Sequence, residues 1–427
     1  MFKRRFNLFV ISAIIFTLAF SFSTLTVTAD NKIGSWIGAW ATSQMAAWTT
    51  VDWDGGFSEN GFDDETIRMI VNPTASGEEV KVRLSNEFGE KPLTFGKATI
   101  GKTDEDAKVI SDSIETLTFA GEESVTVPAG EAIVSDPVPF DVVDGEDLTI
   151  SVYIPEESGP ATWHNTANQK SYFSVGDATA NVDGSGFTND SNSWFFLSGV
   201  DVLTKSNKKA RTIVALGDSI TAGYLSTLNA NQRYTDFLNE RLDKEINNQT
   251  FSVLNQGISG NKILRDDAIF GEKALDRLER DVFSQTNVTD IILFEGINDI
   301  GHVPHQLDAE EIIKGMKQIA KEADKRGIRI YVGTLTPMNS FTGDPTYYTE
   351  EGEETRQAVN EWIRSQDIFD AVFDFDRVVR DPENPDKILP KYDSGDQLHP
   401  NDAGLKAMAD SIDLSIFKQP LSRTAYK

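Results

Sequence analysis

The first half of the chain alternates between apolar and polar residues, which is the pattern of β-strands with one buried face. Residues 80–84 read Val-Lys-Val-Arg-Leu, and residues 148–154 read Leu-Thr-Ile-Ser-Val-Tyr-Ile. Gly, Pro, Asp and Asn break this pattern often between residues 30 and 202, as in the Pro-Ala-Gly at 128–130. Many short strands joined by turns predict an all-β domain of sandwich or jelly-roll type.

The rhythm changes after Arg211, where short apolar runs alternate with longer amphipathic stretches. The apolar runs predict strands at residues 212–216, 251–256, 290–295, 329–334 and 371–375. The clearest helix is predicted over 308–326, because acidic residues stand at its start and basic residues followed by Gly327 stand at its end. Strands that alternate with helices predict a parallel sheet covered on both faces, in a flavodoxin-like α/β arrangement.

A polar stretch of lysine, serine and asparagine at residues 205–209 separates the two patterns. The length of 427 residues also exceeds the usual size of one hydrophobic core. We therefore predict a β-sandwich-like accessory domain over residues 30–205 and an α/β domain over residues 206–427.

The first residues have the features of a secretory signal peptide. Three basic residues at 3–5 precede an apolar run at 8–22, and small residues at 27–29 follow it. The apolar run is shorter than the roughly 20 residues that a membrane-spanning helix needs. We therefore expect cleavage near Ala29, a secreted mature protein and no stable membrane insertion after cleavage.

The amino-acid composition limits the kinds of binding partner and of reactive site that this protein can have. The net charge of -27 argues against nucleic acid and anionic membrane surfaces as main partners, because like charges repel. The chain contains no cysteine, which excludes disulfides, thiolate metal sites and a cysteine nucleophile.

One apolar strand runs directly into a serine. Residues 213–220 read Ile-Val-Ala-Leu-Gly-Asp-Ser-Ile, so Ser219 follows the strand within a tight turn. Open α/β proteins build their sites at the carboxyl edge of the sheet, where such a residue is presented. Ser219 is therefore a candidate nucleophile, which needs a base, an orienting carboxylate and hydrogen-bond donors for an oxyanion.

The search for a base is short, because the chain has histidines only at positions 164, 302, 305 and 399. His399 follows Asp396 by three residues, a spacing that lets the carboxylate fix which ring nitrogen carries the proton. The other ring nitrogen is then free to face Ser219. His164 stands beside Trp163 in the β domain and is expected to pack or hydrogen-bond locally.

Three donors at strand ends are candidates for stabilising an oxyanion. They are the backbone N–H of Ser219, the backbone N–H of Gly260 after the second predicted strand, and the side-chain amide of Asn298 after the third. Each of these segments alone has an ordinary explanation as a turn, a tight loop or a helix cap. Their succession at neighbouring strand ends, together with the single Asp-x-x-His, favours an active site for acyl transfer.

These blocks resemble the conserved blocks of the GDSL or SGNH hydrolase family. The matching positions, in the family's order, are Gly217-Asp218-Ser219, Gly260, Asn298 and Asp396-x-x-His399. Ile220 stands where the family name has leucine, which is a conservative apolar change. The resemblance covers residues 211 to about 417 and implies a serine esterase that needs no metal or other cofactor. It also implies a triad of Ser219, His399 and Asp396, with the three donors above as the oxyanion hole.

The first half adds a second resemblance. Residues 36–43 read Trp-Ile-Gly-Ala-Trp-Ala-Thr-Ser, and residues 83–89 read Arg-Leu-Ser-Asn-Glu-Phe-Gly, followed by the Pro-Leu at 92–93. These motifs are similar to those of secreted bacterial SGNH esterases that carry a β domain before the hydrolase domain. Ser43 within the first motif has no base beside it in the sequence, and we do not assign it a catalytic role.

The expected substrates are carboxylic esters, and short-chain acyl or acetylated carbohydrate esters are favoured because no long exposed apolar lid is visible. Three alternatives stay open. The first is a lipase or phospholipase of the same family. The second is an envelope polysaccharide-binding protein whose hydrolase half is idle. The third is a metal-dependent hydrolase that uses His302, His305 and Asp299.

The longest loop at the carboxyl edge is predicted over residues 338–352 and contains Phe341, Tyr347 and Tyr348. These rings would suit contact with an acyl group or a sugar. The alternative is a floppy acidic loop without a role in binding.

Overall fold

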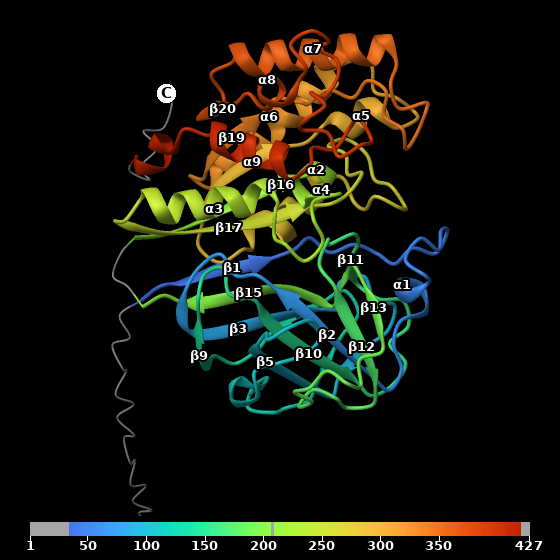
Figure 1. Cartoon of the computed structure of the whole chain (residues 1–427), viewed down its shortest axis with the longest axis vertical. Coiled ribbons are helices and arrows are strands. Elements are labelled where there is room, and N and C mark those ends of the chain that lie inside the picture. The colour runs from blue at the N-terminus through green and yellow to red at the C-terminus, as the bar shows by residue number, and fades with distance from the viewer. Residues whose placement is uncertain (1–33, 206–208, 420–427) are drawn as a thin grey trace, which may run out of the picture. The chain divides into compact units, whose positions relative to one another are not determined.

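The alternating segments of the first half form two main antiparallel sheets (Figure 1), together with the two-stranded pairs β4-β7 and β11-β14. The structure is a computed structural model that describes residues 34–205 and 209–419. The predicted signal peptide, residues 1–29, lies outside the described residues. The strands of this half are β1 (Trp36–Ala41), β2 (Glu65–Val71), β3 (Gly77–Ser85), β4 (Leu93–Phe95), β5 (Lys97–Lys102), β6 (Glu115–Leu117), β7 (Val125–Val127), β8 (Ala132–Val134), β9 (Val138–Val142), β10 (Leu148–Ile154), β11 (Trp163–His164), β12 (Ser171–Val175), β13 (Asn189–Ser191), β14 (Trp194–Phe195) and β15 (Leu197–Leu203). The short helices α1 (Phe57–Asn60) and η1 (Ser111–Ser113) lie between strands.

The two sheets share one apolar core. One sheet has the order β1-β15-β3-β8, with β9 also paired to β3, and the other has the order β13-β12-β2-β10-β5-β6. Val80 and Val82 of the first sheet and Ile150 and Val152 of the second are fully buried in the same cluster. The prediction of an antiparallel all-β first half is confirmed.

Strand β10 differs from the prediction, because it is buried on both faces and not on one. Thr149 and Ser151, which alternate with its apolar residues, are almost fully buried as well. Ser151 Oγ accepts a hydrogen bond of 2.9 Å from Nε of the buried Arg68. Arg68 also donates to the carbonyl oxygens of Ala107 and Asn181, at 2.6 and 2.7 Å. The irregular segments that contain Ala107 and Asn181 therefore cover the outer face of the sheet. They bury polar groups that the sequence alternation assigns to solvent.

The second half contains a five-stranded parallel sheet. Its strands are β16 (Lys209–Gly217), β17 (Gln249–Gly257), β18 (Val288–Phe294), β19 (Arg329–Gly333) and β20 (Ala371–Phe373). The sheet order is β17-β16-β18-β19-β20, and each neighbouring pair is parallel. This is the flavodoxin-like order, which places a crevice at the carboxyl ends of the neighbouring strands β16 and β18. The predicted fold of this half is confirmed.

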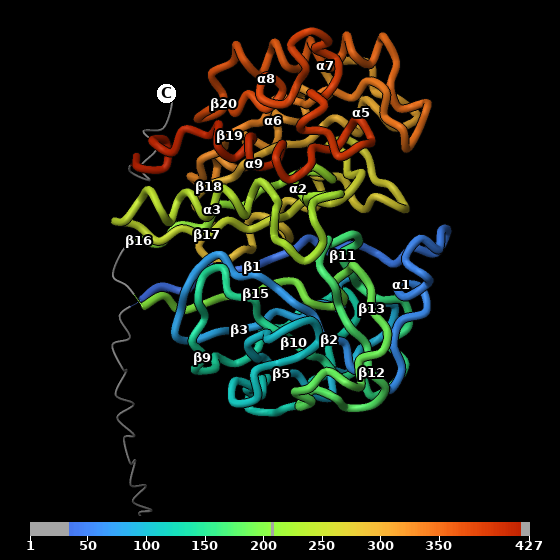
Figure 2. The backbone as a smooth tube through the Cα atoms, viewed as in Figure 1, coloured from blue at the N-terminus to red at the C-terminus, as the bar shows by residue number. Residues whose placement is uncertain are grey.

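Helices cover both faces of the parallel sheet (Figure 2). They are α2 (Ser219–Ala222), α3 (Tyr234–Glu245), α4 (Ala274–Arg277), α5 (Ile297–Gly301), α6 (Ala309–Lys325), α7 (Glu350–Ser365), α8 (Phe375–Val379) and α9 (Asp402–Ser411), together with the π-helical η2 (Leu278–Phe283) and the 3-10 helix η3 (Leu414–Lys418). Val214 and Leu216 of β16 pack into the core that contains α6, and Ile213 and Ala215 pack into the core that contains α3 and α9. This alternation is what a strand buried on both faces requires.

The residues from Gly34 onward form one compact unit. Strand β1 packs against β17, and a Cβ atom on Gly38 would lie only 2.8 Å from Cδ1 of Leu254. A side chain at this position would therefore have to displace the Leu254 side chain. The antiparallel strands end at Leu203 and the parallel sheet begins at Lys209, on either side of the predicted boundary. The division into two independent domains stays a prediction. Within the described ranges, no helix is long and apolar enough to span a bilayer.

Candidate active site

A tight turn at the end of β16 presents Ser219. Asp218 is extended and caps α2, because its Oδ1 accepts a hydrogen bond of 2.9 Å from the Ile220 N–H. A Cβ atom on Gly217 would lie 2.1 Å from Oγ1 of Thr221, so only glycine fits where the strand turns into the helix. The strand, the glycine and the cap together fix Ser219 at the carboxyl edge of the sheet.

The structure brings Ser219, His399 and Asp396 into one hydrogen-bonded chain. Nε2 of His399 lies 2.8 Å from Oγ of Ser219, and Nδ1 of His399 lies 2.6 Å from Oδ2 of Asp396. Ser219 is 6% exposed and His399 is 4% exposed, so water has little access to the bond between them. The ring of Tyr224 packs edge-on against the imidazole, with 4.7 Å between ring centroids.

The Asp396 carboxylate is held in its ionised form. Its Oδ1 accepts hydrogen bonds of 2.9 Å from the backbone N–H groups of Leu398 and His399. Burial raises the pKa of this carboxyl, but its hydrogen bonds and the charge of His399 outweigh burial and lower the pKa to about 2. An ionised carboxylate at Nδ1 leaves Nε2 of His399 without a proton in the neutral ring, as a base facing Ser219 requires.

The predicted oxyanion donors lie beside this chain of hydrogen bonds. Ser219, Gly260, Asn298 and His399 all line one cavity of about 470 Å³. Gly260 has a φ of +76°, and a Cβ atom there would lie 2.2 Å from the ring of Phe270. A side chain at this position would therefore be strained and would collide with the cavity wall.

Asn298 is fixed by two hydrogen bonds. Its Nδ2 donates to the carbonyl oxygen of Asn261 at 3.0 Å, and its Oδ1 accepts from the hydroxyl of Tyr347 at 2.8 Å. A bond to Oδ1 leaves the second hydrogen of Nδ2 available to the cavity. Sequence reasoning missed this role of Tyr347, which is buried and not a free contact surface. Gly301 is one helical turn after Asn298, and a Cβ atom there would lie 2.2 Å from the Tyr347 ring.

We expect Tyr347→Phe to lower kcat for a small ester about tenfold, because one hydrogen bond that orients the Asn298 amide is lost. KM should change little, since an oxyanion donor acts mainly in the transition state. Steady-state kinetics on p-nitrophenyl acetate measure both constants. Tyr348→Phe is the matched control, because Tyr348 is the next residue and its hydroxyl lies 3.4 Å from Asp386. An equal fall of kcat in both variants would contradict the positioning role of Tyr347.

The loop predicted over 338–352 is shorter in the structure, because α7 begins at Glu350. The Thr342 N–H donates to the carbonyl oxygen of Asp396 at 3.0 Å, which ties the loop to the segment of Asp396 and His399. Phe341 lines the cavity, and its ring centroid lies 6.0 Å from that of His399. Phe341 is therefore placed to contact a bound group, as in the first of the two predicted alternatives, whereas Tyr347 and Tyr348 bind Asn298 and Asp386.

A buried arginine that sequence reasoning missed joins the strand ends behind the site. Nη2 of Arg277 donates to the carbonyl oxygen of Gly217 at 3.0 Å, and Nη1 donates to that of Gln256 at 2.8 Å. Its Nε donates to Oδ1 of Asn261 at 2.9 Å. Arg277 is fully buried and thereby connects β16, β17 and the loop of Gly260.

The same arginine contacts the first half of the chain. Its Nη1 donates to Oγ of Ser43 at 2.9 Å, and Ser43 donates its hydroxyl to Oε1 of Gln256 at 2.6 Å. Nδ1 of His164 lies 2.8 Å from the carbonyl oxygen of Ser43, and burial lowers the pKa of His164 to about 4. Ser43 is therefore a structural hydroxyl, and no base faces its oxygen in these contacts.

Three carboxyl groups surround this arginine and the turn of Ser219. Burial raises the pKa of Asp218 to about 7 and that of Asp299 to about 6. Burial also raises the pKa of Glu295, whose Oε2 lies 3.5 Å from Nη2 of Arg277. Neither carboxyl oxygen of Glu295 has a hydrogen-bond partner. The positive charge of Arg277 acts in the opposite direction to burial, because it lowers the pKa of Asp218 and of Glu295.

The residues of the metal hypothesis do not form a ligand cluster. Asp299 accepts backbone hydrogen bonds from Ile263 and Leu264 at 2.8 and 3.0 Å. The ring of His302 stacks on Phe270, and Nδ1 of His305 contacts the carbonyl oxygen of Ile300 at 2.8 Å. Across residues 34–205 and 209–419, no group of three or more His, Cys, Asp or Glu side chains is arranged to hold a metal ion.

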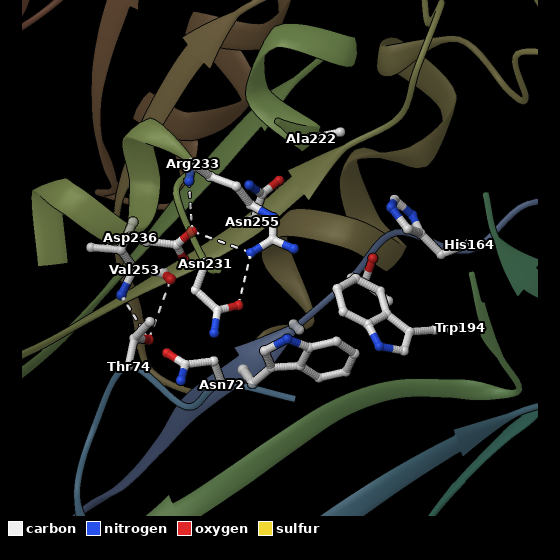
Figure 3. A pocket seen from close by; sticks show the side chains of 13 residues that line it. Asn72, Thr74, His164, Trp194, Ala222, Asn231, Arg233, Asp236, Val253 and Asn255 are labelled. Carbon is white, nitrogen blue, oxygen red and sulfur yellow. Dashed lines mark hydrogen bonds and ion pairs between the residues drawn. The ribbon is translucent and has the colours of Figure 1, made fainter. Parts of the chain in front are cut away.

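Another cavity, much smaller at about 30 Å³, lies near Arg233 (Figure 3). In Figure 3 the guanidinium of Arg233 points toward Asn231 and Asp236, and Nη1 donates to each at 3.2 Å. The space holds only about one or two water molecules. The cavity at Ser219 is therefore the better candidate for binding an ester.

Part of the chain is similar to known proteins. Residues 215–407 match the model of the GDSL-like Lipase/Acylhydrolase family. A putative lipolytic protein of the G-D-S-L family from Desulfitobacterium hafniense is 20% identical, over 47% of this chain and 96% of its own, with a TM-score of 0.36. The aryl esterase of M. smegmatis is 17% identical, over 47% of this chain and 95% of its own, with a TM-score of 0.37. A carbohydrate acetylesterase family member from Sinorhizobium meliloti is 17% identical, over 49% of this chain and all 100% of its own, with a TM-score of 0.39. No curated protein matches the chain.

Proposed function

Because residues 215–407 belong to the GDSL-like lipase/acylhydrolase family, we propose that this protein is a secreted serine esterase whose triad is Ser219, His399 and Asp396. The observation that carries the proposal is the hydrogen-bonded chain from Ser219 through His399 to Asp396, with distances of 2.8 and 2.6 Å. It opens into a cavity that Gly260 and Asn298 also line. The secreted location rests on the predicted signal peptide at residues 1–29.

Acylation follows from this geometry. Nε2 of His399 takes the proton of the Ser219 hydroxyl while Oγ attacks the ester carbonyl carbon. The carbonyl π electrons move to oxygen, where the Ser219 N–H, the Gly260 N–H and Nδ2 of Asn298 donate to the negative charge. Asp396 stabilises the imidazolium, which then gives its proton to the leaving alcohol as the ester bond breaks.

Deacylation repeats the same steps with water. His399 takes a proton from a water molecule, whose oxygen attacks the acyl carbon on Ser219. The second oxyanion uses the same three donors. When it collapses, the bond to Oγ of Ser219 breaks, His399 returns the proton to Oγ, and the carboxylic acid leaves. None of these steps requires a cofactor.

We propose short-chain acyl or acetylated carbohydrate esters as the substrates. The cavity wall contains polar groups beside its aromatic rings, such as Asn165, Thr166 and Ser259. A long acyl chain would leave these groups without hydrogen-bond partners, which is unfavourable. The lipase alternative predicts the opposite preference, with activity that rises along a series of p-nitrophenyl esters from acetate to palmitate.

A fluorophosphonate probe tests the proposed nucleophile against the alternative of an idle hydrolase half. The full chain should gain the mass of one phosphonyl group, located by mass spectrometry on the peptide that contains Ser219. His399→Ala should remain unlabelled, because the serine hydroxyl is then no longer activated. Ser43 provides an internal control, since it is a buried serine whose hydroxyl is bound to Gln256. A wild-type chain that stays unlabelled, or label on Ser43, would contradict the proposal.

A further inference from the structure

The cavity at Ser219 adjoins a second large cavity, whose walls belong almost entirely to the first half of the chain. Each has a volume of about 470 Å³, and they share Trp48, Trp53, Thr166 and Tyr224 as lining residues. The other residues that line the second cavity are Asp54, Trp163, Asp190, Ser191, Asn192 and Ser193. We call this second space the β-side cavity. It is lined by polar side chains and by indole rings.

An exposed tryptophan stands where the two cavities meet. Trp53 is 67% exposed, and it is the only aromatic residue among the exposed large hydrophobic residues in the described ranges. Its ring is held edge-on by Trp48, with 5.5 Å between ring centroids and an interplanar angle of 83°. Trp48 is itself fixed, because its Nε1 donates to the carbonyl oxygen of Ile269 at 2.7 Å. A large apolar surface on a fixed support, left open to solvent at a cavity rim, is typical of a binding platform.

Two polar atoms on the wall of the cavity at Ser219 lack hydrogen-bond partners. Asn165 is only 2% exposed and lines the cavity at Ser219, and its Oδ1 accepts no hydrogen bond. Ser259, which belongs to the second half of the chain, lines the same cavity, and its buried Oγ also has no hydrogen-bond partner. Buried acceptors without partners are unfavourable, so these atoms suit a ligand that carries hydroxyl groups.

We propose that the β-side cavity is a saccharide subsite, which binds the sugar of an acylated, uncharged oligosaccharide while the ester lies at Ser219. The inference rests on the proposed esterase function. The apolar C–H face of a pyranose ring stacks on Trp53, and its hydroxyl groups bind Asn165 and the polar side chains of the cavity. The first half of the chain is thereby a substrate-binding part of the enzyme.

Charge selects an uncharged sugar. Asp54 and Asp190 both line the β-side cavity, and within the part of the chain that the structure describes only Lys170, 3.1 Å from Asp190, forms an ion pair with either of them. The chain as a whole carries a net charge of -27. Sugar hydroxyl groups donate well to carboxylates, whereas an anionic uronic acid would be repelled by them. An acyl chain would use Trp53 but would leave the polar side chains of the cavity unpaired.

The subsite is tested by Trp53→Ala in the full chain, assayed on acetylated xylotetraose and on p-nitrophenyl acetate. KM for the acetylated oligosaccharide should rise about tenfold, as the loss of one stacking contact predicts, with kcat little changed. Both constants for p-nitrophenyl acetate should change much less than KM for the oligosaccharide, because this small ester does not extend from the cavity at Ser219 into the β-side cavity. Trp53→Phe should recover most of the affinity for the oligosaccharide.

Val175→Ala is the matched control, because Val175 is 80% exposed on the first half and lines neither cavity. An unchanged KM for the oligosaccharide in Trp53→Ala would overturn the subsite, as would an equal change in Val175→Ala. A KM that rises for p-nitrophenyl palmitate, and not for acetylated xylotetraose, would assign the β-side cavity to an acyl chain and overturn the proposal. Acetylated oligogalacturonate should bind more weakly than acetylated xylotetraose, and the reverse order would overturn the preference for an uncharged sugar.

The failure of the subsite and the failure of the esterase function give different results. Ser219→Ala should still bind xylotetraose, seen as quenching of tryptophan fluorescence, and Trp53→Ala should weaken that binding. Binding that depends on Trp53 in a wild-type chain without any esterase activity would contradict the proposed function and leave the subsite standing. Esterase activity without any binding of xylotetraose would contradict the subsite and leave the proposed function standing.

Discussion

Ser219→Ala should lower kcat/KM for p-nitrophenyl acetate by roughly 10⁴- to 10⁶-fold, because the residue that forms the acyl-enzyme is gone. The remaining rate comes from the oxyanion donors and from binding. Among the described residues, Oγ of Ser219 makes one hydrogen bond, to Nε2 of His399, so the fold should lose little stability when it is removed. Steady-state kinetics measure the loss, and far-UV circular dichroism with a thermal melt shows that the variant is folded.

Ser226→Ala is a suitable control for this substitution. Ser226 is also buried, lies seven residues further along the same segment, and does not line the cavity at Ser219. Its kcat/KM should stay within about twofold of wild type, as is usual for a change away from the reacting atoms. A Ser219→Ala chain that keeps more than about 1% of wild-type activity would contradict the proposed nucleophile. Activity that survives His399→Ala but vanishes with chelator and returns with zinc would favour the metal hypothesis.

The parts of the site that lie directly at strand ends could be predicted from the sequence. Ser219, Gly260 and Asn298 each follow a strand of a parallel sheet, and β16 is paired with both β17 and β18. The carboxyl ends of neighbouring parallel strands meet at one edge, so residues far apart in the chain are brought together by topology alone. The pairing of His399 with Asp396 is local, over three residues, and is equally readable.

The parts that sequence reasoning missed depend on side chains that reach across the fold. The Tyr347 hydroxyl meets Asn298 across 49 residues, and Nη1 of Arg277 meets Oγ of Ser43 across 234 residues. No periodicity or motif relates such partners, because their contact depends on loop paths and on the packing of the two halves. The expectation that β10 is half-buried was wrong for the same reason. The segments that cover its outer face are irregular, so the alternation within β10 does not predict them.

Arg277 is the missed residue with the largest expected effect, because several parts of the active site are attached to it. Its guanidinium donates to the carbonyl oxygens at the ends of β16 and β17 and to Asn261, whose own carbonyl oxygen accepts from Asn298. It is also 3.1 Å from Oδ2 of the buried Asp281. A planar group with five N–H donors in a fixed geometry can make these contacts together, whereas a lysine ammonium cannot.

We expect Arg277→Met to lower the free energy of unfolding by about 3–5 kcal/mol, because it leaves buried carboxyl groups without their cation. It should also lower kcat, since the turn of Ser219 and the loop of Gly260 lose a common anchor. Urea denaturation measures the free energy, with an unchanged m-value as the sign that the folded state is intact. Arg326→Met is the control, because Arg326 pairs with Glu279 and Glu322 at the surface and its loss should cost less than about 1 kcal/mol.

The stability difference between Arg277→Met and wild type should grow as pH rises from about 5 to 8. Burial raises the pKa of Asp218 to about 7 and also raises that of Glu295, while the charge of Arg277 lowers both. Without the arginine these pKa values rise further, so the folded state holds protons that the unfolded state has already released. Stability then falls with rising pH between the unfolded and folded pKa values, and in the variant the fall continues to a higher pH, so the difference opens as pH passes the wild-type pKa of Asp218 near 7. Urea midpoints at several pH values measure this difference. A constant difference from pH 5 to 8 would mean that Arg277 acts through its backbone hydrogen bonds and not through the charges of these carboxyl groups.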